Sequence, residues 1–111
     1  MLAKKFRLQI QDWFKERKKT VSRQSNFFAV KIRENGLSFS RFGAVIGKKV
    51  HKSAVRRNKI KRAIFNFIRL NKYHEAPGKD ILIIVSPAAS QLIRKGIKEE
   101  LKKVLWLIYT I

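Results

Sequence analysis

The chain has 111 residues, of which 27 are Lys or Arg and 7 are Asp or Glu, and its formal net charge at pH 7 is +20. This length predicts a single domain, residues 1–111, and a hydrophobic fraction of 45% supplies a core and argues against disorder. Cysteine is absent, so disulfide bonds and cysteine metal sites are excluded. This high positive charge predicts a polyanionic partner: nucleic acid, an anionic membrane or an acidic protein.

The first predicted element is a short amphipathic helix over about residues 8–18, where Leu8, Ile10, Trp13 and Phe14 are separated by charged residues. A basic, polar loop follows it. No apolar run of signal-peptide length precedes this helix, and the apolar segment 104–111 is too short to span a bilayer. Together with the lack of cysteine, these features predict a cytoplasmic protein.

Three strands are predicted next. Residues 26–32 alternate in polarity, so that Phe28, Val30 and Ile32 share one face and Phe27 and Lys31 share the other. Residues 34–36 contain an Asn-Gly pair, which predicts a tight hairpin turn into a second strand over about residues 38–47. Residues 80–86 form a continuous apolar run, which is typical of a strand covered on both faces.

Two further helices complete the prediction. Residues 53–71 form the first, with Ser53 as its N-cap. Residues 90–109 form the second, and its apolar face carries Ile93, Ile97, Leu101, Val104 and Ile108. The order is α-β-β-α-β-α, with room for a short extra strand near residue 21. This order predicts an α+β fold: a small two-layer sandwich with helices on one face of a sheet and the other face open.

The strongest functional signal is segment 48–62, KKVHKSAVRRNKIKR, in which eight of fifteen residues are Lys or Arg and none is acidic. On a helical wheel of ~100° per residue, its apolar residues and those that follow gather on one side: Ile60, Ala63, Ile64 and Phe67. The adjoining sector displays polar and basic residues: Arg57, Asn58, Lys61, Arg62 and Arg69. Because no acidic residue interleaves with them, this sector predicts a polyanion-binding face rather than an ordinary solvated one.

Enzyme signatures are missing from the sequence. His51 and His74 show no metal-ligand spacing, and the adjacent pair Glu99-Glu100 would point ~100° apart on a helix. We therefore predict no catalytic residue and no active site made by the protein. Aromatic residues beside cations on the open sheet face, such as Phe27 and Lys31, would suit an unpaired nucleic-acid strand.

The segment 54–62, A-x-x-R-N-K-I-K-R, resembles the signature helix of the bacterial ribonuclease P protein subunit, a family in which two lysines precede that helix as Lys48-Lys49 do here. The pair Arg7-Leu8 before Phe14, the segment 41–43 and the segment 80–92 are also similar to that family. The resemblance covers nearly the whole chain.

This resemblance implies a protein subunit of an endoribonuclease that removes the 5′ leader from precursor tRNA. The RNA subunit would perform the metal-dependent hydrolysis. The partners would be that RNA and precursor tRNA, with no membrane and no small-molecule substrate. The protein alone would bind no cofactor, and Mg²⁺ would act through the RNA. The implied fold resembles the second domain of ribosomal protein S5, with a left-handed β-α-β crossover in place of the usual right-handed one.

Carried over by position, contacts to the RNA subunit fall on Lys48, Lys49, Lys52, Arg56, Arg57, Asn58, Lys61, Arg62 and Arg69. Leader contacts fall on Arg7, Trp13, Phe14, Lys18, Phe28 and Lys31, where Lys18 replaces an aromatic residue common in the family. Whether Asn58 positions a metal ion is left open. The residues alone also allow a structural RNA-binding protein, such as a ribosomal protein without a role in catalysis, or a basic membrane-surface protein.

Overall fold

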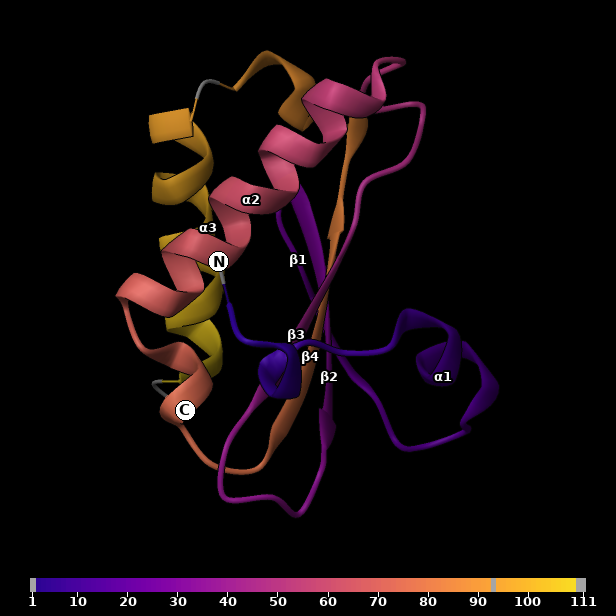
Figure 1. The fold of residues 1–111 in the computed structure, drawn as a ribbon, viewed down its shortest axis with the longest axis vertical. Coiled ribbons are helices and arrows are strands. Elements are labelled where there is room, and N and C mark those ends of the chain that lie inside the picture. Colours follow the sequence, from indigo (N-terminus) through magenta and orange to yellow (C-terminus); the bar gives the residue numbers. More distant parts are fainter. Residues whose placement is uncertain (1, 93, 110–111) are drawn as a thin grey trace.

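Two helices cover one face of a four-stranded sheet in the computed structural model, which describes residues 2–92 and 94–109 (Figure 1). Helices α2 (Ala54–Leu70) and α3 (Arg94–Tyr109) lie on one side of the sheet, and the short helix α1 (Ile10–Lys15) lies on the other. The strands are β1 (Val21–Gln24), β2 (Phe28–Glu34), β3 (Arg41–Val45) and β4 (Lys79–Val85). Three short 3-10 helices are η1 (Lys4–Phe6), η2 (Tyr73–Glu75) and η3 (Pro87–Gln91). The predicted two-layer α+β architecture is confirmed, including the short strand near residue 21.

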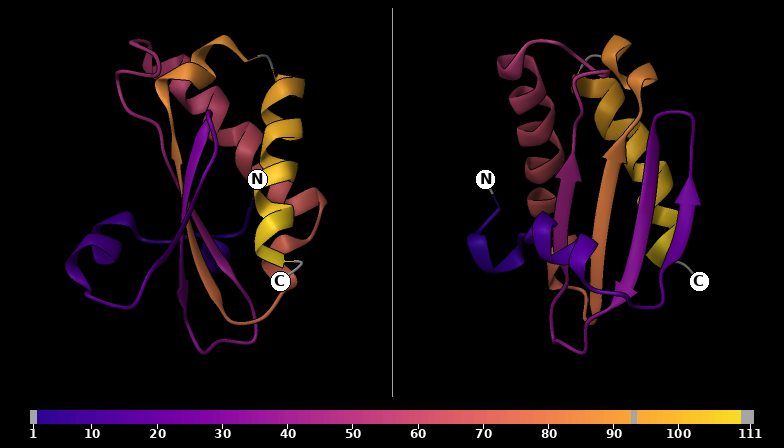
Figure 2. Two further views of the ribbon diagram at one scale, coloured as in Figure 1. Left: turned by 180° about the vertical axis from the view of Figure 1, so that it is seen from behind. Right: turned by 90° about the vertical axis from the view of Figure 1, so that its right-hand side faces the viewer.

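The order of the strands in the sheet is β1-β2-β4-β3. Strand β2 runs antiparallel to both β1 and β4, whereas β3 and β4 are parallel and are joined through α2. In the right panel of Figure 2, β3 and β4 both point upward, β4 lies to the right of β3, and α2 lies behind the sheet. This geometry is a left-handed crossover, the hand that the family resemblance implied and that is rare among β-α-β units.

The hairpin predicted at residues 34–36 is wrong. Strands β2 and β3 do not pair, because β4 inserts between them and pairs with both. Asn35 and Gly36 do form a turn: Gly36 has a φ of +69°, and the side-chain oxygen of Asn35 accepts a hydrogen bond from the backbone of Leu37. The Asn35 amide also donates to Asp80 at the start of β4, at 2.8 Å. An apolar strand that needs cover on both faces takes the central position, and a local turn signal cannot reveal that.

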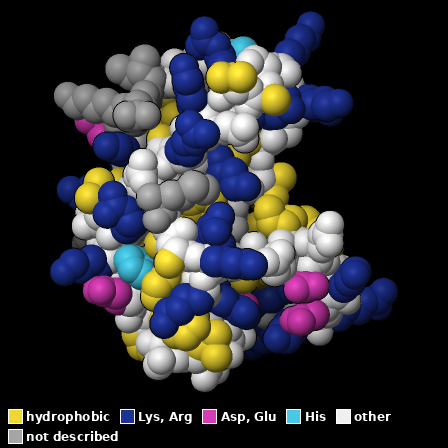
Figure 3. All heavy atoms as spheres, in the orientation of Figure 1, with side chains coloured by type: hydrophobic (Ala, Val, Ile, Leu, Met, Phe, Trp, Pro, Cys, Tyr) yellow, Lys and Arg dark blue, Asp and Glu magenta, His cyan; other side chains and the backbone are white. Residues whose placement is uncertain are grey.

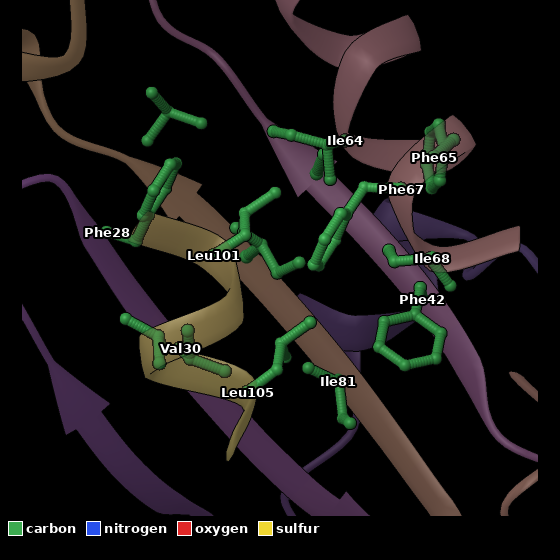
Figure 4. Packing of buried hydrophobic residues seen from close by; sticks show 14 of the residues in the cluster. Phe28, Val30, Phe42, Ile64, Phe65, Phe67, Ile68, Ile81, Leu101 and Leu105 are labelled. Atoms are coloured by element: carbon green, nitrogen blue, oxygen red, sulfur yellow. The ribbon is translucent and has the colours of Figure 1, made fainter. Parts of the chain in front are cut away.

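The hydrophobic core lies between the sheet and the pair α2 and α3, as Figure 4 shows. The predicted inner faces are confirmed: Val30 and Ile32 of β2 are buried, as are Ile64 of α2 and Leu101 of α3. Helix α3 begins at Arg94 instead of Ser90, because residues 87–91 first form a 3-10 helix led by a proline. The side chains of Ile93 and Ile108, which were assigned to the same apolar face, lie outside the described residues.

The N-terminal segment crosses from one side of the sheet to the other. The backbone N–H of Leu8 donates to the carbonyl oxygen of Phe42 at 2.8 Å, and Arg7 bridges the same strand. A Cβ atom on Gly43 would lie only 3.2 Å from side-chain atoms of both Leu8 and Leu82, so glycine is what lets Leu8 lie against the sheet. Beyond this point α1 spans only residues 10–15, which is shorter than the helix predicted over residues 8–18.

Candidate nucleic-acid interface

Helix α2 presents the basic face that the sequence predicted. The Ser53 hydroxyl accepts a hydrogen bond from the backbone of Arg56, which sets the start of the helix at Ala54. The side chains of Arg56, Asn58, Arg62 and Arg69 are exposed, whereas those of Arg57 and Lys61 are half-buried. In Figure 3 the Lys and Arg side chains gather over α2, and most of the acidic side chains visible there lie away from it.

The four salt bridges of the described residues leave this face uncompensated. They pair Lys18 with Glu16, Arg41 with Asp80, Lys79 with Glu34, and Lys103 with Glu100. No described member of segment 48–62 takes part in an ion pair. A concentration of like charge with no internal counter-charge is the electrostatic pattern of a phosphate-binding surface.

Arg57 has a partly structural role on this face. Its Nη1 atom donates to the carbonyl oxygens of His51 and Lys52, at 2.9 and 3.0 Å. The Nδ1 atom of His51 in turn accepts a hydrogen bond from the backbone of Ser53. The guanidinium therefore ties the end of the 46–53 loop to the first turns of α2. That loop carries the exposed side chains of Lys48, Lys49 and Lys52, so the structure brings these three residues to the same end of the helix.

On the other side of the sheet, the side chains of Phe14 and Trp13 of α1 differ in their exposure to solvent. Phe14 is 67% exposed and remains available to stack on a base. Trp13 is only 6% exposed, and the guanidinium of Arg33 lies 3.8 Å from the centre of its ring. Arg33 also donates to the carbonyl oxygen of Trp13 at 2.8 Å and to the hydroxyl of Thr20 at 2.9 Å. The ring of Trp13 anchors α1 to β2 and is not exposed for the leader contact that the resemblance implied.

Two phenylalanines of the predicted leader face also point elsewhere. Phe28 is fully buried and pairs with Val85 across the core face of the sheet, so its ring is not exposed for the leader contact that the resemblance implied. Phe27 packs against the same core instead of facing outward. Lys31 does lie on the open face, where it donates to the hydroxyl of Ser22 at 3.3 Å.

The remaining two residues of the leader set lie along the N-terminal segment. Lys18 is about half exposed and pairs with Glu16 at 3.1 Å. Arg7 is half-buried beside β3, and its Nε atom has no hydrogen-bond partner among the described residues. Both line a small pocket of about 100 Å³ between α1 and the open face of the sheet.

An ion pair that the sequence analysis missed forms part of the floor of this pocket. Arg41 of β3 donates to both carboxylate oxygens of Asp80, at 2.8 and 2.6 Å, and Asp80 is only 7% exposed. The hydrogen bond to Asp80 raises the pKa of Arg41 above its usual value, although burial opposes this shift. This bidentate pair joins neighbouring strands at the open face. The signal that could have found it is the strand alternation, which places Arg41 and Asp80 on the face opposite the core.

Among residues 2–92 and 94–109, no three His, Cys, Asp or Glu side chains form a group that could hold a metal ion. None of the described helices combines the length and the apolar character that crossing a membrane requires.

Comparison with known proteins gives a consistent result. Residues 2–108 match the family model described as Ribonuclease P. The ribonuclease P protein component of Aliivibrio fischeri is 40% identical over 82 residues, which cover 74% of this chain and 68% of that protein. The corresponding component of Thermotoga maritima is 40% identical over 96 residues, which cover 86% of this chain and 72% of that protein.

Solved structures agree with this match. A mutant Staphylococcus aureus RNase P protein with defective mRNA degradation activity superposes with a TM-score of 0.82 at 33% identity, covering 95% of this chain and 89% of that one. The RNase P protein of Thermotoga maritima superposes with a TM-score of 0.76 at 34% identity, covering 95% and 96%. With sequence and fold in agreement over nearly its whole length, the chain belongs to the ribonuclease P protein family.

Proposed function

We propose that this chain is the protein subunit of ribonuclease P. It binds the catalytic RNA through the α2 face and binds the 5′ leader of precursor tRNA on the open face of the sheet. The observation that carries this proposal is the α2 face itself, a concentration of Lys and Arg with no ion pair among its described members, in a chain of this family.

The side chains on α2 suit RNA chemically. Arginine offers a planar fork to phosphate and lysine offers a compact charge. Asn58, exposed among them, can both donate to and accept from a base edge or a 2′-hydroxyl. The RNA performs the hydrolysis in this proposal, and Mg²⁺ enters through the RNA. The cytoplasmic location expected from the sequence belongs to the same proposal.

The open face suits a single strand. Phe14 supplies an exposed aromatic ring, Lys31 and Lys18 supply charge, and Arg7 lies at the edge of the pocket between α1 and the sheet. Stacking on an aromatic ring and neutralisation of phosphates are the two contacts that bind unpaired RNA without reading its sequence. Phe14 is the one exposed aromatic of the predicted leader set, so it carries the stacking part of the proposal.

The test is a cleavage assay with precursor tRNA and a bacterial ribonuclease P RNA, performed with and without the protein over a series of Mg²⁺ concentrations. The protein is expected to lower the Mg²⁺ and salt concentrations needed for cleavage, because its cations neutralise phosphates that free ions otherwise screen. If the Mg²⁺ requirement stays unchanged when the protein is added, the proposal fails.

A pair of matched variants localises the effect. Arg56→Gln combined with Arg62→Gln removes two exposed charges from α2, and should weaken binding to the RNA and lower the slope of its salt dependence by roughly two units. Lys102→Gln combined with Lys103→Gln removes two exposed charges from α3. It should leave binding close to wild type, and an equal loss in both variants would mean that only total charge matters.

A further inference from the structure

A small pocket lies where the N-terminal segment passes the middle of α2. Its volume is about 200 Å³. Three cations line it, Lys4 and Arg7 from the N-terminal segment and Lys61 from α2, together with the polar side chain of Gln9 and the ring of Phe65. No Asp or Glu is among its lining residues.

The backbone holds these cations in place. The N–H of Arg7 donates to the carbonyl oxygen of Lys4 at 3.1 Å, which closes the 3-10 turn of η1. Arg7 and Leu8 are then fixed to β3 through their contacts with Phe42. Lys61 comes from a regular helix whose next turn buries Phe65 against the core. The backbones that carry these three residues thus belong to two separate, ordered elements, and all three residues line the same pocket.

The positive charge that lines the pocket favours the binding of an anion. Three like charges repel one another in a concave site whose own lining holds no acidic side chain. Arg7 also borders the pocket beside α1, where Asp12, Glu16 and Asp80 lie, so the deficit of negative charge is greatest on the α2 side. The buried Nε atom of Arg7 has no hydrogen-bond partner among the described residues. An anion bound in the pocket would offset the repulsion among the three cations, and the unpaired buried donor of Arg7 is itself unfavourable.

The position of the pocket is equally informative. Arg7 lines this pocket on the α2 side and also lines the small pocket between α1 and the open face of the sheet. The family resemblance implies a leader contact for Arg7 and an RNA-subunit contact for Lys61. The structure brings these two residues to the lining of one pocket, so the two surfaces meet there.

We propose that Lys4, Arg7 and Lys61 form a binding pocket for one phosphodiester group of bound RNA, at the junction of the two surfaces. This inference rests on the proposed function. The guanidinium of Arg7 supplies directed donors to the phosphate oxygens, and the two lysines supply charge. The phosphate belongs either to the RNA subunit or to the leader of precursor tRNA, and one experiment separates these sources.

The experiment compares wild type with Lys4→Gln, Arg7→Gln and the control Lys5→Gln. Lys5 is the neighbour of Lys4 in η1, but it lies over the rings of Phe6 and Phe39 and does not line the pocket. Two affinities are measured over a series of KCl concentrations. The first is the affinity of the protein for the RNA subunit alone. The second is the affinity of the reconstituted holoenzyme for precursor tRNA, with mature tRNA as its reference.

If the phosphate belongs to the RNA subunit, Lys4→Gln and Arg7→Gln each lower the first affinity by about tenfold and its salt slope by about one unit. If it belongs to the leader, both variants bind the RNA subunit normally. In that case they lose about tenfold in affinity for precursor tRNA, with no change for mature tRNA. Lys5→Gln stays close to wild type in both cases.

The inference is overturned if Lys4→Gln and Arg7→Gln match the Lys5→Gln control in both affinities while wild type binds both RNAs. That result leaves the proposed function intact. If wild type binds neither RNA, the proposed function fails, and the inference about the pocket fails with it. Thermal unfolding checks that Arg7→Gln is folded, and because Lys4 is exposed, its substitution keeps the test valid if Arg7→Gln is not.

Discussion

Cations that look alike in the sequence have different tasks in the structure. Arg56 and Arg57 are neighbours on the basic helix, yet the first is exposed and the second donates to two loop carbonyl oxygens. Arg33 and Arg41 likewise bind parts of the protein, the ring of Trp13 and the carboxylate of Asp80. Charge and helical spacing predict which residues are polar and which are displayed. They cannot predict which guanidinium finds an internal acceptor, because those acceptors come from loops and distant strands.

The substitution Arg57→Lys tests whether geometry or charge matters at this position. Lysine keeps the charge but lacks the planar guanidinium that places one nitrogen, Nη1, between the carbonyl oxygens of His51 and Lys52. We expect affinity for the RNA subunit to fall roughly tenfold, and amide hydrogen exchange of residues 51–53 to accelerate. The matched change Arg62→Lys, at an exposed site, should bind nearly as wild type. If Arg57→Lys also binds as wild type with unchanged exchange, Arg57 acts as a charge alone.

At the scale of elements, prediction succeeded where the signals were local. The Ser53 cap and the apolar face of α2, and the continuous apolar run of β4, placed both elements to within one residue or so. Prediction failed where the structure of a segment depends on a partner that is distant in the sequence. Strand β4 separates β2 from β3, so the Asn35-Gly36 turn joins strands that do not pair. Phe28 shares the inward face of β2 with Val30 and Ile32, as the alternation predicted, so its assignment to the leader surface, which came from the resemblance, conflicts with that alternation.

Helix α1 depends on β2 for its position. Of the six residues of α1, Trp13 is the buried one, and Arg33 holds it through a stacked guanidinium and a hydrogen bond to its carbonyl oxygen. Arg33→Gln should therefore release α1 from the sheet, and amide protection over residues 10–16 should fall by roughly tenfold or more. Protection in β2 and β4 should persist, because the core on the other face is untouched. Hydrogen exchange measured by mass spectrometry reports both regions.

The control for this release is Lys31→Gln, on the same strand and the same face. Lys31 makes one hydrogen bond to Ser22 and does not touch Trp13 in any described contact. It should leave residues 10–16 protected. Equal loss of protection in both variants would show that α1 is held by the general charge of the face and not by Arg33.

The whole molecule places two basic surfaces on a small body. Its principal extents are 36 × 28 × 25 Å, and it carries a net charge of +20. The screening length in 0.1 M salt is about 10 Å, so charges on neighbouring elements interact while those on opposite ends are largely screened. The N-terminal segment lies between the α2 face and the open face, and its Arg7 lines a pocket on each side. Repulsion among Lys and Arg side chains is therefore strongest on the surfaces where RNA is proposed to bind. Bound RNA would reduce this repulsion and stabilise the folded state.

This repulsion predicts the response of the free protein to salt. Raising KCl from about 0.02 to 0.5 M shortens the screening length severalfold, and it should weaken the repulsion among 27 basic residues more than it weakens the four described salt bridges. The midpoint of thermal unfolding should therefore rise, by roughly 4–8 °C for each kcal/mol of repulsion removed. The double variant Lys59→Gln, Lys102→Gln removes two exposed charges that take part in none of these salt bridges, and should show a smaller rise. A midpoint that falls as KCl increases would mean that the internal ion pairs stabilise the folded state more than the repulsion destabilises it.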